Sequence, residues 1–362
     1  MSGTSGDGVD ASIIRTNGIN KYESIKDKYF EYDIDIYRDI HNLKEKIHKI
    51  EHLEKFKNKI DNLERRITIF HSKIIKDLNI SNDTLVGFHG QTLYHNPKEK
   101  ISRQLGNGKL LNQLTNKDIV FNFRKNDILN GGQGAPLTPI FHYLISLQNK
   151  INLPVCFLNI GGISNITIVK DSENIFELIS KDIGPGNCLI DNWVRKNSNK
   201  KYDKNGALAS AGTRNEIIFE QAQELYMNRS DQKKLSYDTN DFDVSFVRGL
   251  NLEDGVRTLT DFTASIIGEE LSLAFKNSKE KIKNVLLCGG GRYNKFLIKK
   301  IKENLSLGIN LDLIDKYKIN GDFIESQAFA FLAVRSVMKL PISFPNTTGC
   351  NKPSCGGKII KN

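Results

Sequence analysis

Three glycine-rich stretches place possible anion-binding groups at wide intervals along the chain: GTSGDGVD at 3–10, DIGPGN at 182–187 and CGGGRYN at 288–294. Backbone N–H groups can close on a phosphate where no Cβ intervenes, so such stretches often cradle phosphates. Taken singly, each is more often a plain hairpin or the start of a helix. Their recurrence beside strand-like segments favours a protein that holds a nucleotide with several turns at once.

The first stretch has the side chains that a phosphate and its cation need. The hydroxyls of Thr4 and Ser5 can donate hydrogen bonds to phosphate oxygens. Asp7 is a candidate Mg²⁺ ligand that acts through a water molecule. The residues that we expect to bind the nucleotide here are Gly3, Thr4, Ser5, Gly6, Asp7, Gly8, Val9 and Asp10.

The second stretch joins a carboxylate to a turn that suits an anion. Gly184 and Gly186 permit close approach of the backbone. Asn187 is a good N-cap for a following helix, whose N-terminus favours anions. Asp182 would stand next to bound phosphates, although an aspartate often does no more than cap a turn. The third stretch offers a flat ledge for a ring at Gly289, Gly290 and Gly291.

Polar residues also follow other strand-like segments. In GFHGQTLYH at 87–95, the histidine and glutamine leave the carboxyl end of a strand, where α/β proteins bind ligands. A single histidine is usually structural, and the GGQGAP loop can serve only to turn the chain. The candidate substrate contacts are His89, Gly90, Gln91, Thr92, Gln133 and Asn159. Asn159 and Asp191 are equally candidates for polar supports of the site.

Hydrophobic patterning indicates the elements that must carry these loops. Short apolar or alternating runs predict strands at residues 9–16, 32–37, 85–89, 119–123, 155–160, 166–170, 175–179, 285–288 and 309–314. Apolar residues at helical spacing predict helices at residues 39–58, 61–78, from Pro139 onward, 187–197, 214–228, 256–277, 292–305 and 324–338. Strands come first and helices later, twice over, which indicates two α/β halves that face each other across a cleft.

Composition narrows the class of protein. The chain has 362 residues, enough for two domains of ordinary size, and a net charge of +10. Its lysines are spread along the chain with little aromatic interleaving, so we expect no nucleic-acid partner. No apolar run approaches the ~18 residues of a membrane span, and the polar start is unlike a secretory signal, so we expect no membrane association.

Cysteine usage indicates a reducing compartment. The five cysteines are an odd number without the spacing of a disulfide framework. Cys350 and Cys355 do not have the two-residue interval of a zinc pair. We therefore expect isolated thiols in a cytoplasmic protein.

Motifs along nearly the whole chain resemble those of one family. In order, they are MSGTSGDGVD (1–10), GFHGQTLYH (87–95), NDILNGGQGAPLTPIFH (126–142), LNIGGISNIT (158–167), DIGPGNCLID (182–191), YDKNGALA (202–209), TLTDFTASII (258–267), LLCGGGRYN (286–294) and ESQAFAFLA (325–333). Their order and spacing closely resemble those of the anhydro-N-acetylmuramic acid kinases, the sugar kinases of cell-wall peptidoglycan recycling.

This resemblance implies an α/β fold of the actin-like ATPase (ribonuclease H-like) type, with two domains and an inter-domain cleft. Residues 1–132 and 340–362 would form an N-terminal lobe with the first phosphate loop and the sugar-contacting loop. Residues 133–339 would form a C-terminal lobe with the second phosphate loop, Asp182 and the adenosine-binding turn. A homodimer is also implied by the resemblance.

The resemblance also implies a reaction. ATP and water would convert 1,6-anhydro-N-acetylmuramate to N-acetylmuramate 6-phosphate and ADP, with opening of the anhydro ring and phosphorylation of O6. In this family an aspartate at the position of Asp182 is the general base for the attacking water, and Glu325 would reach the sugar or its water. ATP and Mg²⁺ are the implied cofactors, and the partner is a small anhydro amino sugar.

Two polar residues each have a purely structural interpretation as well. Glu325 stands three residues after Asp322 in DFIE, which is the spacing of a capping box. Arg124 is either a surface charge or a partner for the lactyl carboxylate of a muramic acid. The sequence leaves open which basic group binds that carboxylate.

Several positions depart from the family pattern. The family usually has residues before MSGTS that form the first strand of the phosphate hairpin. Either translation begins upstream of Met1, or the nucleotide site is weakened and residues 9–16 are poorly ordered. Gly6 replaces a larger apolar residue, which would loosen the loop, and Asn122 and Asn205 replace expected carboxylates. The stretch at 235–242 departs as well. The alternative function is therefore a degenerate member that binds nucleotide with little or no turnover.

Overall fold

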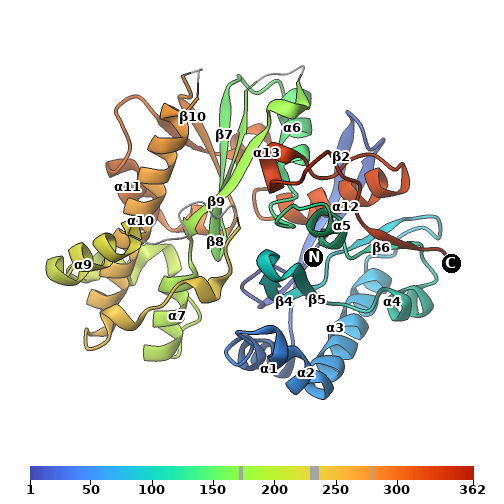
Figure 1. Ribbon diagram of the computed structural model, residues 1–362, viewed down its shortest axis with the longest axis horizontal. Helices are drawn as coiled ribbons and strands as arrows, with labels where there is room; N and C mark the ends of the chain where they lie inside the picture. The colour runs from blue at the N-terminus through green and yellow to red at the C-terminus, as the bar shows by residue number, and fades with distance from the viewer. Residues whose placement is uncertain (171–173, 229–235, 279–280) are drawn as a thin grey trace. The chain divides into compact units, whose positions relative to one another are not determined.

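The computed structural model describes residues 1–170, 174–228, 236–278 and 281–362, and the chain divides into two compact units (Figure 1). Unit 1 comprises Met1–Ile151, Ser172–Leu178 and Phe323–Asn362, and unit 2 comprises Asn152–Asp171 and Ile179–Asp322. The first residue of the 235–242 stretch lies outside the described residues. None of the described helices combines the length and apolar character needed to cross a membrane.

The predicted lobes had boundaries at 132/133 and 339/340, whereas unit 1 extends to Ile151 and begins again at Phe323. Two helices in these extra segments pack within unit 1 and account for the difference. Helix α6 (Pro139–Gln148) joins unit 1 through Phe141, whose ring lies 5.0 Å from that of Tyr22, centroid to centroid. Helix α12 (Ile324–Val337) joins it through a hydrogen bond of 2.9 Å from Arg335 to the carbonyl of Gly18. Both helices are therefore anchored on the N-terminal hairpin.

The described residues of unit 1 form three small sheets. Strands β1 (Gly8–Thr16) and β2 (Tyr22–Glu31) form an antiparallel hairpin with a register shift after Ile13. Strands β12 (Lys358–Ile360), β6 (Ile119–Phe121) and β3 (Val86–Phe88) form the second sheet, and β4 (Gln91–Asn96) pairs with β5 (Ile101–Leu105) in the third. Since β1 is paired with β2 along its whole length, the expected poor order of residues 9–16 is wrong.

The predicted strand at residues 32–37 is also wrong, because helix α1 (Ile34–Lys44) begins there. The alternation in YDIDIY covers only six residues and is compatible with either structure. Ile36, Ile40 and Leu43 are buried at helical spacing, and this longer pattern decides the outcome. The chain then forms α2 (Ile50–Lys55) and α3 (Lys57–Asp77), so the predicted helix at 39–58 is interrupted.

The core of unit 1 lies under these helices. Buried residues of α3, including Leu63 and Ile67, pack with Val9 of the hairpin and with Leu93 and Leu105 of the third sheet. The remaining short elements of unit 1 are η1 (Pro97–Glu99), α4 (Gly108–Thr115), α5 (Arg124–Leu129), η2 (Ile175–Glu177) and α13 (Pro345–Thr348). The predicted strand at 175–179 is wrong over η2, where the Asn174 side chain accepts a hydrogen bond from the amide of Phe176.

Unit 2 is built on one five-stranded sheet with the order β11 (Asn310–Leu313), β10 (Asn284–Cys288), β7 (Val155–Ile160), β8 (Ile163–Val169) and β9 (Ile179–Pro185). Strands β7, β10 and β11 are parallel, whereas β8 is antiparallel to both β7 and β9. This strand order and direction pattern is that of the ribonuclease H-like fold. The predicted α/β class is confirmed.

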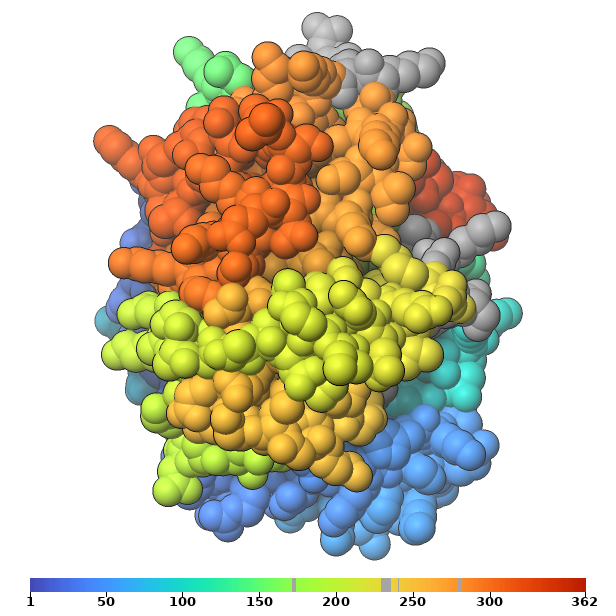
Figure 2. Space-filling view, turned by 90° about the vertical axis from the view of Figure 1, so that its left-hand side faces the viewer, coloured from blue at the N-terminus to red at the C-terminus, as the bar shows by residue number. Residues whose placement is uncertain are grey.

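Helices cover this sheet and form a second apolar cluster beside it. Helix α10 (Leu252–Lys276) packs Ala264, Ile267 and Leu271 against the sheet residues Leu158 and Ile166. The other helices are α7 (Cys188–Asn197), η3 (Lys204–Gly206), α8 (Ala207–Ala211), α9 (Glu216–Met227), η4 (Thr239–Asp241), η5 (Ser245–Val247), η6 (Gly290–Tyr293), α11 (Lys295–Glu303) and η7 (Ile314–Tyr317). Figure 2 shows α9 in yellow-green and α11 in orange at the surface of unit 2.

Candidate active site

The first phosphate loop lies between Ser2 and β1. Its Thr4 and Ser5 side chains are exposed, and the Ser5 hydroxyl donates a hydrogen bond to Asp7. Gly6 adopts φ +65°, which favours glycine, and a Cβ there would meet Ile40 at 2.9 Å. Glycine at position 6 therefore allows a tight turn against Ile40 of α1. A hydrogen bond of 3.2 Å from the Gly6 amide to the Gly3 carbonyl closes this turn.

The side chain of Gln91 holds the first phosphate loop in place through two hydrogen bonds. Its side chain is completely buried, and its amide nitrogen donates to the carbonyl of Gly3 at 3.0 Å. Its side-chain oxygen accepts a hydrogen bond from the hydroxyl of Ser2 at 2.5 Å. Both polar atoms of the Gln91 side chain, a predicted substrate contact, thus bond to residues of the first phosphate loop or beside it.

His89 is the adjacent member of the same motif and is held by two groups. Its Nδ1–H donates to the carbonyl of Gly90 at 2.9 Å, and its Nε2 accepts from the guanidinium of Arg124 at 3.0 Å. Burial, reinforced by the nearby Arg124 charge, lowers the pKa of His89 well below 6.5. The imidazole is therefore neutral, with its proton on Nδ1. Thr92, in β4, is half-buried and accepts from Gln104.

The GGQGAP loop is fixed by a residue that the motifs in the sequence did not single out. Asp127 is buried, and one carboxylate oxygen accepts from the amide of Gly134 at 2.7 Å. The other oxygen accepts from the hydroxyl of Thr348 at 2.7 Å. The half-buried Gln133 lies on this loop, and its backbone N–H donates to the Thr348 carbonyl at 2.7 Å. An aspartate shortly before a glycine-rich loop is the signal that could have identified Asp127.

Glu325 lies in the first turn of α12 and is half-buried. The N-cap of this helix is Phe323, which makes no side-chain capping bond. The capping-box interpretation of Glu325 is therefore wrong. Burial lowers the pKa of the Met1 amino group to about 6, and the charges of Asp10 and Glu325 act in the opposite direction. Glu325 accordingly lies near Met1, two residues before the first phosphate loop.

In unit 2, Asp182 lies on β9 and is 9% exposed. The backbone amide of Tyr237 donates a hydrogen bond of 2.8 Å to its Oδ2. This bond comes from a residue 55 positions away, and it orients the carboxylate. Asp182 therefore lies in the middle of β9, two residues before Gly184 of the glycine turn that the sequence predicted.

The second phosphate turn packs on the glycine pair of LNIGGISNIT. Gly184 has φ +145°, and a Cβ there would meet Ile266 at 2.7 Å. A Cβ on Gly186 would meet the carbonyl of Gly161 at 2.3 Å, so glycine is required for this approach. Asn187 is the N-cap of α7, as predicted, although its side chain makes no capping bond.

The third glycine turn lies beside Asn159. A Cβ on Gly289 would meet Asn159 Oδ1 at 2.4 Å, whereas one on Gly290 would meet no atom within 4 Å. Arg292, which the motifs in the sequence did not single out either, has a completely buried side chain and donates to the Gly289 carbonyl at 3.0 Å. It also pairs with Asp315 and Asp322. Open space therefore lies beside Gly290, and Arg292 fixes the carbonyl of the preceding Gly289.

The comparisons with known proteins decide the family. The family model described as anhydro-N-acetylmuramic acid kinase matches residues 1–362. The chain belongs to the anhydro-N-acetylmuramic acid kinase family. It is therefore a kinase, a phosphotransferase with an alcohol acceptor that uses ATP.

Relatives in this family match along their whole length. The chain is 54% identical over 365 residues to the anhydro-N-acetylmuramic acid kinase of Pelagibacter ubique, covering 100% of this chain and 97% of the relative. It is 35% identical to that of Zymomonas mobilis over 99% of this chain and 98% of the relative. The corresponding protein of Agrobacterium fabrum is 32% identical over 100% and 97%.

One solved structure, the activator of the 2-hydroxyisocaproyl-CoA dehydratase from Clostridium difficile with bound ADPNP, is a distant match. The match covers 52% of this chain and 62% of the activator chain, at 12% identity and a TM-score of 0.32. At this TM-score the likeness bears on neither the fold nor the function.

Asp7 is a carboxylate of the first phosphate loop that could hold Mg²⁺. Among the described residues, no group of three or more histidine, cysteine, aspartate or glutamate side chains could hold a metal ion. Kinases usually bind Mg²⁺ through one or two carboxylates and the substrate phosphates instead of a complete protein cage. The half-buried Asp7, next to two exposed hydroxyl residues, matches that pattern.

Proposed function

We propose that this chain converts 1,6-anhydro-N-acetylmuramate, ATP and water to N-acetylmuramate 6-phosphate and ADP in peptidoglycan recycling. The observation that carries the proposal is the family match over residues 1–362, in a chain that has the carboxylate at 182 directly before a phosphate-type turn.

Asp182 is the proposed general base. It accepts a proton from a water molecule, whose oxygen attacks the anomeric carbon of the sugar. The bond from that carbon to O6 breaks, O6 attacks the γ-phosphorus, and ADP leaves with the bond electrons. The Tyr237 amide supports this role because it fixes the orientation of the carboxylate at 2.8 Å. A general base must be held within hydrogen-bond reach of the proton that it removes.

The three glycine turns are the proposed nucleotide contacts. In unit 1, the backbone and hydroxyls of residues 3–10 would donate to phosphate oxygens, and Asp7 would hold Mg²⁺ through water. Mg²⁺ would neutralise charge on the transferring phosphoryl group. In unit 2, Gly184, Gly186 and Asn187 would approach the phosphates, and the ledge at Gly289–Gly291 would carry the adenosine.

The proposed sugar contacts come from His89, Gly90, Thr92 and Gln133, with Glu325 at the sugar or its water. The fixed tautomer of His89 and the anchored GGQGAP loop support preorganised contacts of this kind. We assign a positioning role to Gln91, because it is fully buried against Ser2 and Gly3. Asn159, beside Gly289, supports the adenosine turn in this mechanism.

We also propose that the protein acts in the cytoplasm and associates as a homodimer. The five free cysteines fit a reducing compartment, and the family resemblance is the basis for the dimer. Light scattering of the purified chain at micromolar concentration tests the dimer, and a monomer mass would contradict it.

The direct test is ADP release from the purified full chain with ATP and Mg²⁺, with and without the anhydro sugar. Sugar-dependent ADP, with N-acetylmuramate 6-phosphate as product, is the expected result. Nucleotide binding without sugar-dependent ADP would overturn the proposal and favour the degenerate relative.

A further inference from the structure

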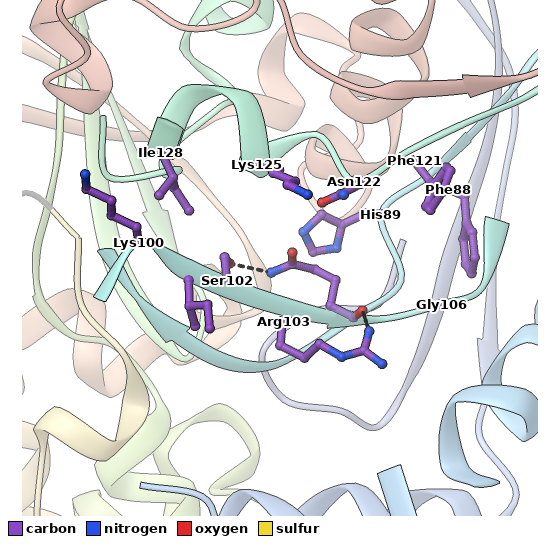
Figure 3. Close-up of a pocket in the computed structure, with 12 residues that line it drawn as sticks. Phe88, His89, Lys100, Ser102, Arg103, Gly106, Phe121, Asn122, Lys125 and Ile128 are labelled. Carbon is purple, nitrogen blue, oxygen red and sulfur yellow. Dashed lines mark hydrogen bonds between the residues drawn. The ribbon is translucent and has the colours of Figure 1, made fainter. Parts of the chain in front are cut away.

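Unit 1 contains a pocket with a volume of about 290 Å³ (Figure 3). One wall is β5, and the opposite wall is formed by α5 and by the residues just before it, as Figure 3 shows. His89 lies on the floor between these walls. The pocket therefore adjoins the loop that we propose to contact the sugar.

The charge of the pocket lining has one sign. The described residues that line it include Lys100, Arg103 and Lys125 and no carboxylate. Arg103 is paired with Glu64 at 2.8 Å, so its charge is largely compensated. The exposed Lys125 and Lys100 are the cations that remain for a ligand. A pocket with this lining attracts an anion.

The neighbouring polar groups carry no negative charge that would neutralise these lysines. His89 is neutral and fixed by Arg124. Asn122 has φ +58° and lines the pocket where the family pattern leads us to expect a carboxylate. An amide at this position removes a negative charge and retains a hydrogen-bond donor. Figure 3 shows Lys125 and Asn122 together beside His89, with Lys100 at the other end of the pocket.

We propose that this pocket receives the carboxylate of the substrate's lactyl ether, with Lys125 as its main cationic partner and Asn122 as a neutral donor. This inference rests on the proposed function, since the muramic sugar carries a single carboxylate. A charge-assisted hydrogen bond to that group would distinguish the muramic sugar from the same ring without its lactyl ether. Lys125 is thus a specificity-determining residue.

Calorimetric titration of the full chain without ATP tests the assignment. The two probes are 1,6-anhydro-N-acetylmuramate and 1,6-anhydro-N-acetylglucosamine, which lacks the lactyl ether. The parent should bind the first more tightly. Lys125→Met should weaken binding of the first probe by about tenfold to a hundredfold and of the second by less than about twofold. Lys100→Met should act in the same direction with a smaller effect.

Lys98→Met is the matched control, because Lys98 is an exposed neighbour that does not line the pocket. It should leave both affinities unchanged. Equal weakening of both sugars by Lys125→Met, or no weakening, would overturn the assignment. Binding of D-lactate alone as tightly as the sugar would also overturn it, in favour of a free carboxylate ligand. Tight, Lys125-dependent sugar binding without sugar-dependent ADP release would contradict the proposed function and leave the pocket assignment standing.

Discussion

The side-chain amide of Gln91 donates a hydrogen bond of 3.0 Å to the backbone carbonyl of Gly3, 88 residues earlier in the chain. The same side chain accepts from the Ser2 hydroxyl, so the motif that follows β3 determines the conformation of the first phosphate loop. A polar residue in a sugar-kinase motif thus supports the loop that we propose to bind the nucleotide.

Replacement of Gln91 by leucine should raise the KM for ATP by about tenfold and change the KM for the sugar much less. The substitution removes both hydrogen bonds and leaves the half-buried Gly3 carbonyl and the buried Ser2 hydroxyl without this partner, at a cost of about 1–3 kcal/mol. Steady-state kinetics with each substrate varied in turn measure the two constants. Gln91→Glu, which retains an acceptor for Ser2 but cannot donate to Gly3, should also raise the KM for ATP. A selective rise in the sugar KM would show that Gln91 contacts the sugar instead.

Asp182→Asn should reduce kcat by at least about a hundredfold, the lower end of the usual contribution of a general base. The asparagine oxygen can still accept from the Tyr237 amide, so the thermal unfolding midpoint should stay near that of the parent. Coupled ADP release measures the rate. The control is Asp312→Asn, at an exposed carboxylate of unit 2 that pairs with Lys316. A kcat close to that of the parent would contradict the assignment of Asp182.

Arg292→Met should destabilise unit 2 by at least about 2 kcal/mol, because it leaves Asp315 and Asp322 without their shared cation. Burial opposes the charge of Arg292, but its hydrogen bonds to Asp322 and Asp315 raise the pKa of the guanidinium above its usual value. The KM for ATP should rise as well, because the Gly289 carbonyl loses its donor. Urea unfolding and ATP kinetics test both effects. Arg292→Lys should be milder, and a methionine variant as stable as the parent would contradict the role.

Stability should fall as the pH is lowered from 7 toward 4. Burial lowers the pKa of His71 and His142 to about 3, and burial with the Arg124 charge lowers that of His89 well below 6.5. Below pH 6.5 the unfolded chain binds protons that the folded chain does not. As the pH falls, each histidine therefore lowers the free energy of unfolding by up to about 1.4 kcal/mol per pH unit, until the pH reaches its pKa in the folded state.

Urea unfolding between pH 7.5 and 4.5 measures this dependence, and His71→Phe should reduce its slope. His48→Gln, at an exposed histidine, is the control and should leave the slope unchanged. An identical slope for His71→Phe and the parent would contradict the contribution of His71.

Local patterns in the sequence determined the α/β class, most of the strands and helices, the three glycine turns and the position of Asp182 before the second turn. Glycine turns and hydrophobic periodicity depend on neighbouring residues, so they can be interpreted without the fold. Motif order along the whole chain likewise identified the family before any geometry was known.

Only the tertiary structure decided which polar residues serve as supports. Gln91 meets Gly3, Asp127 meets Thr348 and Arg292 meets Asp322, across separations of 88, 221 and 30 residues. It also decided that residues 32–37 begin a helix, because Ile36 is buried together with Ile40 and Leu43 on the face of α1 that meets the core. A buried hydrogen bond or packing contact depends on where the fold brings distant residues together, and no local pattern contains that information.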